Sequence, residues 1–426
     1  MSIKSSLGRQ LGTQFDTVFD VVKSNPIYDK AGGSIPSLDL NFAKSKSLLD
    51  GRSTKNKITF TRASSGTYVG SDGLIKTATT NEARFDHDPA TGESLGLLIE
   101  EARTNYLTQS ENFGLWTITT ASGSTYTNQA TSPDGSNAFK IIPDSGATSS
   151  ILNAPSGANY ESVIYSVYVK AAEFDWINVS YYASSSFNNW FNVKTGQLGT
   201  TSRTCEITPA GNGWYRCVVY GNTTNQNFLS LKPGSSNGVA AVGDGVSGIY
   251  VWGAQGEIGS FPTSYIPTTS STVTRAADVA SITGSNFSSW YRQDEGTVFV
   301  NQTSLSTVPQ DFATVFRFND TTVTNILYLR KRPGFSQWVA SGESALFMTR
   351  TISQPSVLSV AYKTDDAAFA AEGTLTNDDS CTIDPNKVEL VIGSSTGSAS
   401  YINGTISRFT YWPTRLPDST LQTITQ

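Results

Sequence analysis

A single histidine restricts the acid–base chemistry that this chain of 426 residues can perform. His87 lies between Asp86 and Asp88, and histidine is the only side chain whose unperturbed pKa lies near neutrality. A Ser-His-Asp triad would have to use this residue, and a zinc site with several histidines is excluded. Because Pro89 follows directly, we interpret the segment as a turn in which the histidine makes hydrogen bonds, and we expect no catalysis from it.

The three cysteines are too few for a four-cysteine metal cluster. Cys205 and Cys217 lie symmetrically about Gly211, in a predicted hairpin whose turn falls at residues 209–213. If the two strands pair in that register, the two thiols face each other within reach of a disulfide bond. The alternative is a pair of small buried thiols, and Cys381 is expected to stay unpaired.

Adjacent carboxylates recur along the chain, but their spacing does not favour hydrolytic chemistry. Glu100 and Glu101 are neighbours on a predicted strand, where successive side chains point to opposite faces. This arrangement spoils the carboxylate separation that a glycosidase needs. The pairs 365–366 and 378–379 are both Asp-Asp in predicted loops, where adjacent aspartates are usually solvated.

Aromatic and amide side chains alternate with apolar ones in residues 175–183 and 188–193. Such alternation predicts strands with one buried and one exposed face. Aromatic rings flanked by amides suit sugars, because a ring contacts the apolar C–H patch while the amides pair with hydroxyls. The alternative is that another domain or subunit covers the rings. The candidate carbohydrate-binding residues on the exposed faces are Trp176, Asn178, Tyr182, Trp190 and Asn192.

The elements that would position these side chains are strands. Alternating segments separated by turn residues recur to the end of the chain. Charged residues make up 15%, against a usual share of about 25%, and Ser, Thr, Asn and Gly take their place. We therefore predict an all-β protein of tandem β-sandwich (jelly-roll) domains, with Trp214 in a core.

Charge and hydropathy exclude two classes of partner. Thirty basic and 35 acidic residues give a net charge of −5, whereas broad nucleic-acid binding needs a basic surface. No run of about 18 apolar residues occurs, so we expect no membrane insertion. The opening residues also lack the apolar region of a signal peptide.

The N-terminal segment carries the clearest helical pattern, and we expect this short helix to end before Pro26. A single helix of this length must bury its apolar stripe, either on its own chain or on a partner. Apolar residues recur there at spacings of three and four, which puts them on one face. These candidate docking residues are Leu7, Leu11, Phe15, Val18, Phe19 and Val22.

Two pentapeptides far apart in the chain are nearly identical. Residues 59–63 read TFTRA and residues 272–276 read TVTRA. Each places an arginine, Arg62 or Arg275, at its fourth position. The similarity indicates two related strands, or a coincidence in a Thr-rich chain.

Several motifs resemble a module common in bacteriophage virion proteins, namely tail fibres, head fibres and carbohydrate-binding structural proteins. One part of the resemblance is the stretch from Ile58 to Ser64, continuing through residues 68–70 and 73–75. The more specific part is the run from Arg84 to Pro89, followed by residues 96–105.

Later motifs resemble β-sandwich domains of such proteins. Residues 110–113 and 213–217 are similar to their carbohydrate-binding modules, and residues 264–268 with 274–278 are similar to the closing segment. Residues 295–297, 401–406 and 411–418 resemble concanavalin A-like (laminin-G-like) domains. The resemblance covers roughly residues 38–426. It implies four parts: an N-terminal docking segment (1–37), a small β-rich module (38–103), a carbohydrate-binding-module-like sandwich (104–284) and a concanavalin A-like sandwich (285–426). The sequence leaves open whether residues 38–103 form a domain or extend the next sandwich.

The resemblance implies a virion structural protein, a tail or head fibre, that displays lectin-like surfaces for attachment to host-cell glycans and performs no catalysis. Its N-terminal segment would dock on other virion proteins, and the chain would form a homo-oligomer, with a trimer favoured. No cofactor is implied apart from a structural calcium ion, to which Asp365 or Asp378 would contribute. Two alternatives stay open: a capsid-decoration or tail-structural subunit that binds no sugar, and a glycan depolymerase.

Overall fold

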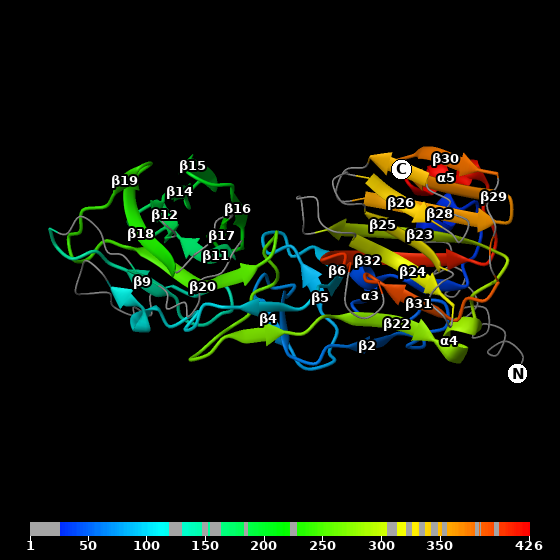
Figure 1. The fold of residues 1–426 in the computed structure, drawn as a ribbon, viewed down its shortest axis with the longest axis horizontal. Helices are drawn as coiled ribbons and strands as arrows, with labels where there is room; N and C mark the ends of the chain where they lie inside the picture. The colour runs from blue at the N-terminus through cyan, green and yellow to red at the C-terminus, as the bar shows by residue number, and fades with distance from the viewer. Residues whose placement is uncertain are drawn as a thin grey trace, which may run out of the picture.

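The described part of the chain forms two β-sandwich lobes that lie side by side along the long axis (Figure 1). This confirms the prediction of an all-β protein with tandem sandwiches. The six predicted docking residues between Leu7 and Val22, and Cys381, lie outside the described residues. Within the described ranges, no helix is long and apolar enough to cross a membrane. The computed structural model describes residues 26–118, 130–146, 152–153, 163–182, 186–221, 228–304, 313–320, 326–331, 337–341, 348–351, 356–379, 383, 385–395 and 400–426.

The first lobe, mainly green in Figure 1, is a sandwich of two antiparallel sheets. One sheet has the order β15 (Gln197–Thr201), β14 (Asn189–Asn192), β12 (Trp176–Tyr182), β18 (Phe228–Ser236), β10 (Leu152–Asn153) and β8 (Thr117–Ile118), with β13 (Ser186–Phe187) on β12 and β19 (Val239–Ala240) on β18. The other has the order β16 (Cys205–Pro209), β17 (Trp214–Tyr220), β11 (Val163–Lys170), β20 (Ile249–Ile258) and β9 (Phe139–Ile141).

Alternate residues of the facing strands fill the space between these two sheets. Ile177 and Val179 of β12 are fully buried there, as are Cys217 of β17 and Val167 of β11. The period of two follows from the pleat of the strand. Removal of this apolar surface from water is the dominant stabilising contribution.

The second lobe, yellow to red in Figure 1, also has two antiparallel sheets. The first follows β30 (Thr374–Asp378), β29 (Asp366–Ala371), β28 (Ser356–Lys363), β23 (Glu295–Ser304), β32 (Gly404–Trp412), β6 (Ser94–Ile99) and β5 (Phe85–His87), with β1 (Leu38–Leu40) on β32. The second follows β2 (Thr59–Thr61), β22 (Val279–Thr283), β31 (Glu389–Ile392), β24 (Ala313–Asn319), β25 (Ile326–Lys331), β26 (Gln337–Ser341) and β27 (Met348–Thr351).

Short helices cover the edges and outer faces of the sheets. α2 (Pro26–Lys30) and α5 (Asp418–Ile424) pack together through Ile27, Leu421 and Ile424, in a cluster that includes Trp412 of β32. α5 begins directly after Pro417, as proline's fixed φ favours at a helix start. The remaining helical turns are α3 (Phe42–Ser45), η1 (Phe113–Leu115) and α4 (Gly284–Ser288).

Residues 38–103 do not form a unit of their own, which corrects the predicted four-part division. Their strands β1, β5 and β6 complete one sheet of the second lobe, and β2 completes the other. Leu40 and Leu97 are fully buried in the same core as Val298 and Phe409. The boundary at 284 also shifts, because β22 pairs with β2 and β31. The second lobe is therefore discontinuous, and the first lobe is inserted into it.

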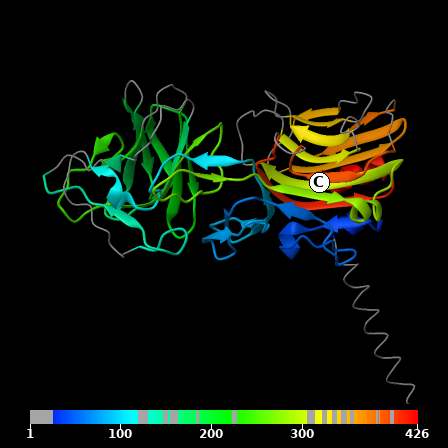
Figure 2. The ribbon, with the colours of Figure 1, turned by 60° about the horizontal axis from the view of Figure 1, so that its bottom comes forward.

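Two small sheets lie at the junction of the lobes. The hairpin of β3 (Gly66–Val69) and β4 (Ile75–Ala78) forms one. The other pairs β7 (Arg103–Asn105), where the chain leaves the second lobe, with β21 (Val273–Arg275), where it returns. Figure 2 shows the early, blue part of the chain along one side of the second lobe and reaching toward the first. Because β7 and β21 pair, the segment that leaves the second lobe and the segment that returns to it lie side by side.

Candidate functional site

The predicted aromatic and amide residues share one face of the first lobe. In the antiparallel register Trp176 lies opposite Asn192, and Asn178 lies opposite Trp190. Their neighbours Ile177 and Phe191 point into the core instead. The predicted orientation of the two strands is therefore correct. Tyr182 ends β12, and its side chain lies outside the described residues.

This face is not an open platform. Trp190 is 6% exposed and Asn178 is fully buried, so the predicted exposure of these two residues is wrong; Trp176 and Asn192 are half-buried. The β18–β19 hairpin accounts for part of this burial. At its turn, Asn237 accepts a hydrogen bond from the Thr200 N–H (2.8 Å) and donates one to the Thr200 hydroxyl (3.1 Å).

The covering hairpin needs small residues beneath the indole rings. A side chain at Gly234 of β18 would overlap the Trp190 ring, and one at Gly199 of β15 would lie 2.6 Å from the Trp176 ring. The rings therefore lie across neighbouring strands, where they pack on backbone. The two indole rings therefore pack against their own chain.

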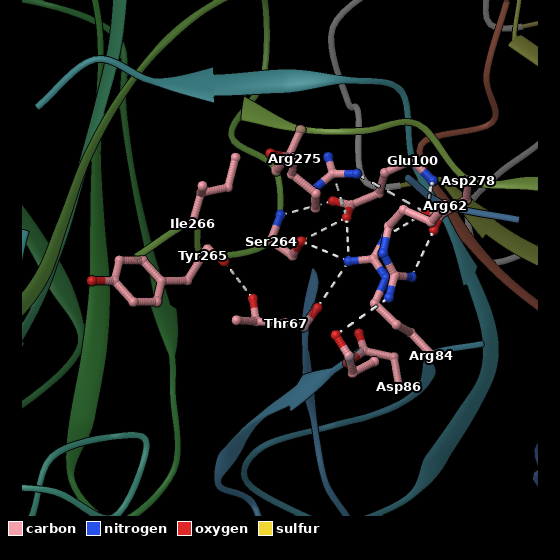
Figure 3. Close-up of polar contacts among 12 residues, drawn as sticks. Arg62, Thr67, Arg84, Asp86, Glu100, Ser264, Tyr265, Ile266, Arg275 and Asp278 are labelled. Atoms are coloured by element: carbon pink, nitrogen blue, oxygen red, sulfur yellow. Dashed lines mark hydrogen bonds and ion pairs between the residues drawn. The ribbon is translucent and has the colours of Figure 1, made fainter. Parts of the chain in front are cut away.

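A cluster of buried ions lies where the chain passes between the two lobes, and Ser264, in the segment that returns from the first lobe, donates hydrogen bonds to it (Figure 3). Arg62 lies 3.1 Å from Asp278, and Arg84 contacts both Asp278 and Glu100, the latter at 2.8 Å. Arg275 approaches Glu100 at 3.5 Å and Asp278 at 4.0 Å. All five side chains are at most 1% exposed. Charges at such depth are tolerated only when they are paired and hydrogen-bonded.

The two crossing segments bring these residues together. Glu100 follows β6 on the outgoing chain, and Asp278 precedes β22 on the returning chain. The Asp278 carboxylate accepts a hydrogen bond from the Glu100 N–H (2.9 Å), and the Asp278 N–H donates to the Glu100 carbonyl (3.0 Å). Arg62 and Arg275, the arginines of the two similar pentapeptides, converge on this one cluster from different strands.

Burial and the neighbouring charges shift the pKa values of residues in the ion cluster. Burial alone would raise the pKa of Glu100, but the guanidinium groups of Arg275 and Arg84, with hydrogen bonds from Ser264, lower it to about 2. Burial lowers the pKa of Arg62, against the attraction of Asp278. Glu100 is therefore ionised and fully engaged at neutral pH. Its neighbour Glu101 pairs with Arg103 instead, so the two glutamates have different partners, as the alternation of a strand predicts.

A cavity of about 230 Å³ opens beside the cluster, between the lobes. Its floor is the outer face of the five-stranded sheet, where Tyr168, Thr208 and Arg216 lie in adjacent strands. The other walls come from the β3–β4 hairpin, from β5 and β6, and from residues 262–265. Charged side chains from both lobes therefore meet in one space.

Three charged groups line this cavity without belonging to the ion cluster. The Arg216 guanidinium stacks over the Tyr168 ring (5.6 Å) and donates to the Ser166 hydroxyl (3.0 Å). Its Nε is buried and has no hydrogen-bond partner among the described residues. Glu206 is half-buried and hydrogen-bonded to Tyr220. Asp86 accepts a hydrogen bond from the Val69 N–H (2.7 Å).

Burial raises the pKa of Asp86 to about 6, against the opposing effects of the Val69 hydrogen bond and Arg84. The folded state therefore favours the neutral form of the Asp86 carboxyl group. The stability that this preference contributes is lost as the pH rises from 3.8, the ordinary pKa of an aspartate, through about 6, the pKa of Asp86 in the folded state. We expect Asp86→Asn to raise the free energy of unfolding by about 1–2 kcal/mol at pH 7.5 and to have no effect near pH 4. Denaturant titrations at both pH values measure this.

Asp88 provides the control for that experiment. Backbone hydrogen bonds from Thr91 and Ala90 lower its pKa, so its ionised form stabilises the fold above its ordinary pKa. Asp88→Asn should lose stability at pH 7.5 where Asp86→Asn gains it. Equal signs for the two variants would contradict the assignment of a raised pKa to Asp86.

The other sequence-predicted residues have structural positions. His87 is buried in β5, and its Nδ1 lies 2.9 Å from the Val69 carbonyl oxygen, which confirms a hydrogen-bonding role. Trp214 is buried, and its Nε1 donates to the Thr131 carbonyl. Asp365 is exposed in the turn between β28 and β29. The side chain of Asp378 lies outside the described residues, and within those residues no group of three or more His, Cys, Asp or Glu is placed to hold a metal.

The two cysteines are free thiols. Cys217 lies opposite Ile207, and Cys205 lies opposite Val219, so the hairpin is centred on residue 212 and not on Gly211. The thiols are consequently diagonal neighbours instead of a facing pair. The predicted facing register is wrong; of the alternative, a pair of small buried thiols, Cys217 is buried and Cys205 is half-buried.

We expect both thiols to resist alkylation in the native protein. Burial raises the pKa of Cys205 to about 12 and raises that of the fully buried Cys217. Because the thiolate is the reactive form, iodoacetamide at pH 8 should label both at least about 100-fold more slowly than in urea. Peptide mass spectrometry measures each site, and a cross-linked 205–217 peptide before reduction would contradict the structure.

The ion cluster was not recognised as a site from the sequence. Its members lie in separate segments, and contacts such as Arg84 to Asp278 join residues 194 positions apart. The repeated TxTRA pattern was the one signal that linked two of them. Of the cavity residues, Arg216 lies in the 213–217 motif that resembles carbohydrate-binding modules, whereas Glu206 and Thr208 carry no sequence signal beyond the alternation of their strand.

No protein-family model matches the sequence, and a search of curated proteins finds no match. Among solved structures, the chain is similar to a Trypanosoma rangeli sialidase in complex with 2,3-difluorosialic acid (13% identity, 34% of this chain, 25% of that chain, TM-score 0.29). It is also similar to the CBM40 of the Ruminococcus gnavus IT-sialidase bound to α2,3-sialyllactose (13% identity, 32% of this chain, 84% of that chain, TM-score 0.27). A third similar structure is that of domains LG4–5 of the mouse laminin α1 chain (8% identity, 74% of this chain, 88% of that chain, TM-score 0.22). The chain spans a quarter of the length of the first of these. The TM-scores are low, so these likenesses carry no argument about activity.

Proposed function

We propose that this chain is a non-catalytic structural protein of a phage virion, a fibre or appendage subunit, whose two β-sandwich lobes bind host-surface glycans. The observation that carries the proposal is the buried ion cluster between the lobes. Arg84, Glu100, Arg275 and Asp278 belong to the motifs by which the sequence resembles phage virion proteins. Those motifs therefore hold together the outgoing and the returning segment at the junction of the lobes, which is a structural task.

A fixed orientation suits display of a binding surface. Side chains that are held by packing and by neighbouring hydrogen bonds bind with less loss of conformational entropy. Single contacts to sugars are weak, and several copies of a subunit on one particle raise the overall affinity through effective concentration. We therefore propose a homo-oligomer, with a trimer favoured, that docks on other virion proteins through its N-terminal segment.

A glycan array with the purified chain tests the binding function. We expect signals for a restricted set of neutral or mixed glycans and none for most of the array. Peptide mass spectrometry of purified particles tests the virion assignment. Silence across the array together with presence in particles would leave the alternative of a capsid-decoration or tail-structural subunit, which the covered Trp176 and Trp190 face favours.

A second candidate function is glycan hydrolysis, and one specific observation favours it. Asp86, with its raised pKa, and Glu206 line the same cavity, as an acid and a second carboxylate of a glycosidase would. Incubation of polysaccharides with the protein, followed by an assay for new reducing ends, tests this candidate. Activity that disappears in Asp86→Asn would replace the binding proposal with an enzymatic one.

A further inference from the structure

We propose that the cavity between the lobes is a binding site for a single neutral sugar residue, held by the side chains of Asp86, Glu206, Thr208 and Arg216. This inference rests on the proposed glycan-binding function and names the site that would perform it. The cavity takes the place of the carbohydrate-binding site predicted on the outer face of β12 and β14, which the β18–β19 hairpin partly covers.

The size of the cavity indicates one sugar unit. Its volume of about 230 Å³ lies below the roughly 300–1,000 Å³ of pockets for drug-sized ligands. A longer saccharide would extend past the outer edge of the floor, which is the edge strand β16, where Thr208 is exposed and Glu206 is half-buried. The site therefore suits a terminal residue or a branch of a glycan.

The walls match the two kinds of surface that a pyranose presents. Apolar side chains, Ile75, Val218 and Pro262, lie among the lining residues, where they can contact C–H groups. The polar groups supply both hydrogen-bond roles, since carboxylates accept and the Arg216 guanidinium donates. The buried Nε of Arg216, which lacks a partner among the described residues, is the group that gains most from a ligand hydroxyl.

The charges in the cavity select against acidic sugars. Glu100 also lines the cavity, but its charge is compensated by Arg84 and Arg275. Outside the ion cluster, the charged groups that line the cavity are one guanidinium, that of Arg216, and two carboxylates, those of Asp86 and Glu206. A carboxylated sugar would meet an excess of negative charge at neutral pH, and repulsion at close range disfavours it. A neutral sugar can accept from Arg216 and donate to both carboxylates.

A matched pair of bulky substitutions tests the site. Thr208 lies opposite Arg216 on the floor of the cavity, and Thr208→Trp fills it. Thr204 is exposed just before the same strand, four residues and about 13 Å away, so Thr204→Trp adds the same ring outside the cavity. Saturation-transfer-difference NMR with the full chain uses glucose, galactose, mannose and N-acetylglucosamine as neutral probes and glucuronate as the acidic probe.

We expect at least one neutral probe to bind wild type and Thr204→Trp equally, while Thr208→Trp weakens that binding at least tenfold. Glu206→Gln, which keeps the size of the side chain, should weaken it about tenfold through loss of a charged hydrogen bond. Thermal unfolding confirms that each variant is folded.

The outcomes separate this inference from the proposed function. If wild type binds glycans on the array and Thr208→Trp binds them as tightly, the cavity site is wrong and the function stands. If glucuronate binds and the neutral probes do not, the ligand class is wrong. If wild type binds neither probes nor array, the glycan-binding function itself fails.

Discussion

Asp278→Asn should lower the free energy of unfolding by about 3–5 kcal/mol, the range measured when one partner of a buried ion pair is removed. Asp278 is the centre of the ion cluster, because its carboxylate contacts Arg62 and Arg84 and accepts the Glu100 N–H. The variant leaves three buried guanidinium groups, those of Arg62, Arg84 and Arg275, with Glu100 as the remaining carboxylate of the cluster. It also places an amide N–H₂ where a carboxylate oxygen accepts hydrogen bonds. Chemical denaturation followed by circular dichroism measures the loss.

An exposed ion pair provides the control for this experiment. Asp294 pairs with Arg292 at 2.6 Å, and both side chains are largely in water, where such pairs contribute little. Asp294→Asn should leave the denaturation midpoint unchanged. Equal shifts for Asp278→Asn and Asp294→Asn would show that the buried cluster does not hold the lobes together. Faster proteolysis between residues 259 and 278 in Asp278→Asn would locate the loss at the junction.

Gly96→Ala is expected to cost about 2–5 kcal/mol, from backbone strain together with overpacking. Gly96 has a φ of +102°, and a Cβ there would overlap the Ile406 carbonyl and lie 2.6 Å from the Ser407 Cα. This is the point where β6 pairs with β32, so the N-terminal strands would be displaced from the second lobe. Loss of soluble expression or a lower denaturation midpoint reports the effect.

A substitution at Gly238 separates backbone strain from overpacking as causes of the destabilisation. Its φ is +80°, but a Cβ would meet nothing within 4 Å. Gly238→Ala therefore carries the conformational strain alone and should cost about 1 kcal/mol. If Gly96→Ala proves no worse than Gly238→Ala, the close approach of β6 and β32 is not what requires glycine at position 96.

Local patterns predicted what the backbone geometry controls. The alternation in residues 175–183 correctly assigned Ile177 and Val179 to the core and Trp176 and Asn178 to the opposite face, because the pleat of a strand sets a period of two. The single histidine was correctly interpreted as a hydrogen-bonding residue.

Exposure could not be predicted in the same way. The Trp176 ring, for example, lies beside Asn237, since a side chain at Gly199 would overlap both, and Asn237 is held there by hydrogen bonds to Thr200 across 37 residues. The alternation of β12 is compatible with an open or a covered outer face. For the same reason the facing register of Cys205 and Cys217 was missed, because a hairpin centre that differs by one position leaves the local pattern unchanged.

The sequence by itself determined the all-β class and the residues that share a strand face, because both follow from interactions within a few residues. Only the tertiary structure decided that residues 38–103 complete the second lobe, that the two TxTRA arginines meet at Asp278, and that Asp86 and Arg216 face one cavity. These features bring together segments that are far apart in the sequence, such as Arg84 and Asp278 at 194 positions or Leu38 and Tyr411 in paired strands, and they depend on the desolvation that this approach imposes.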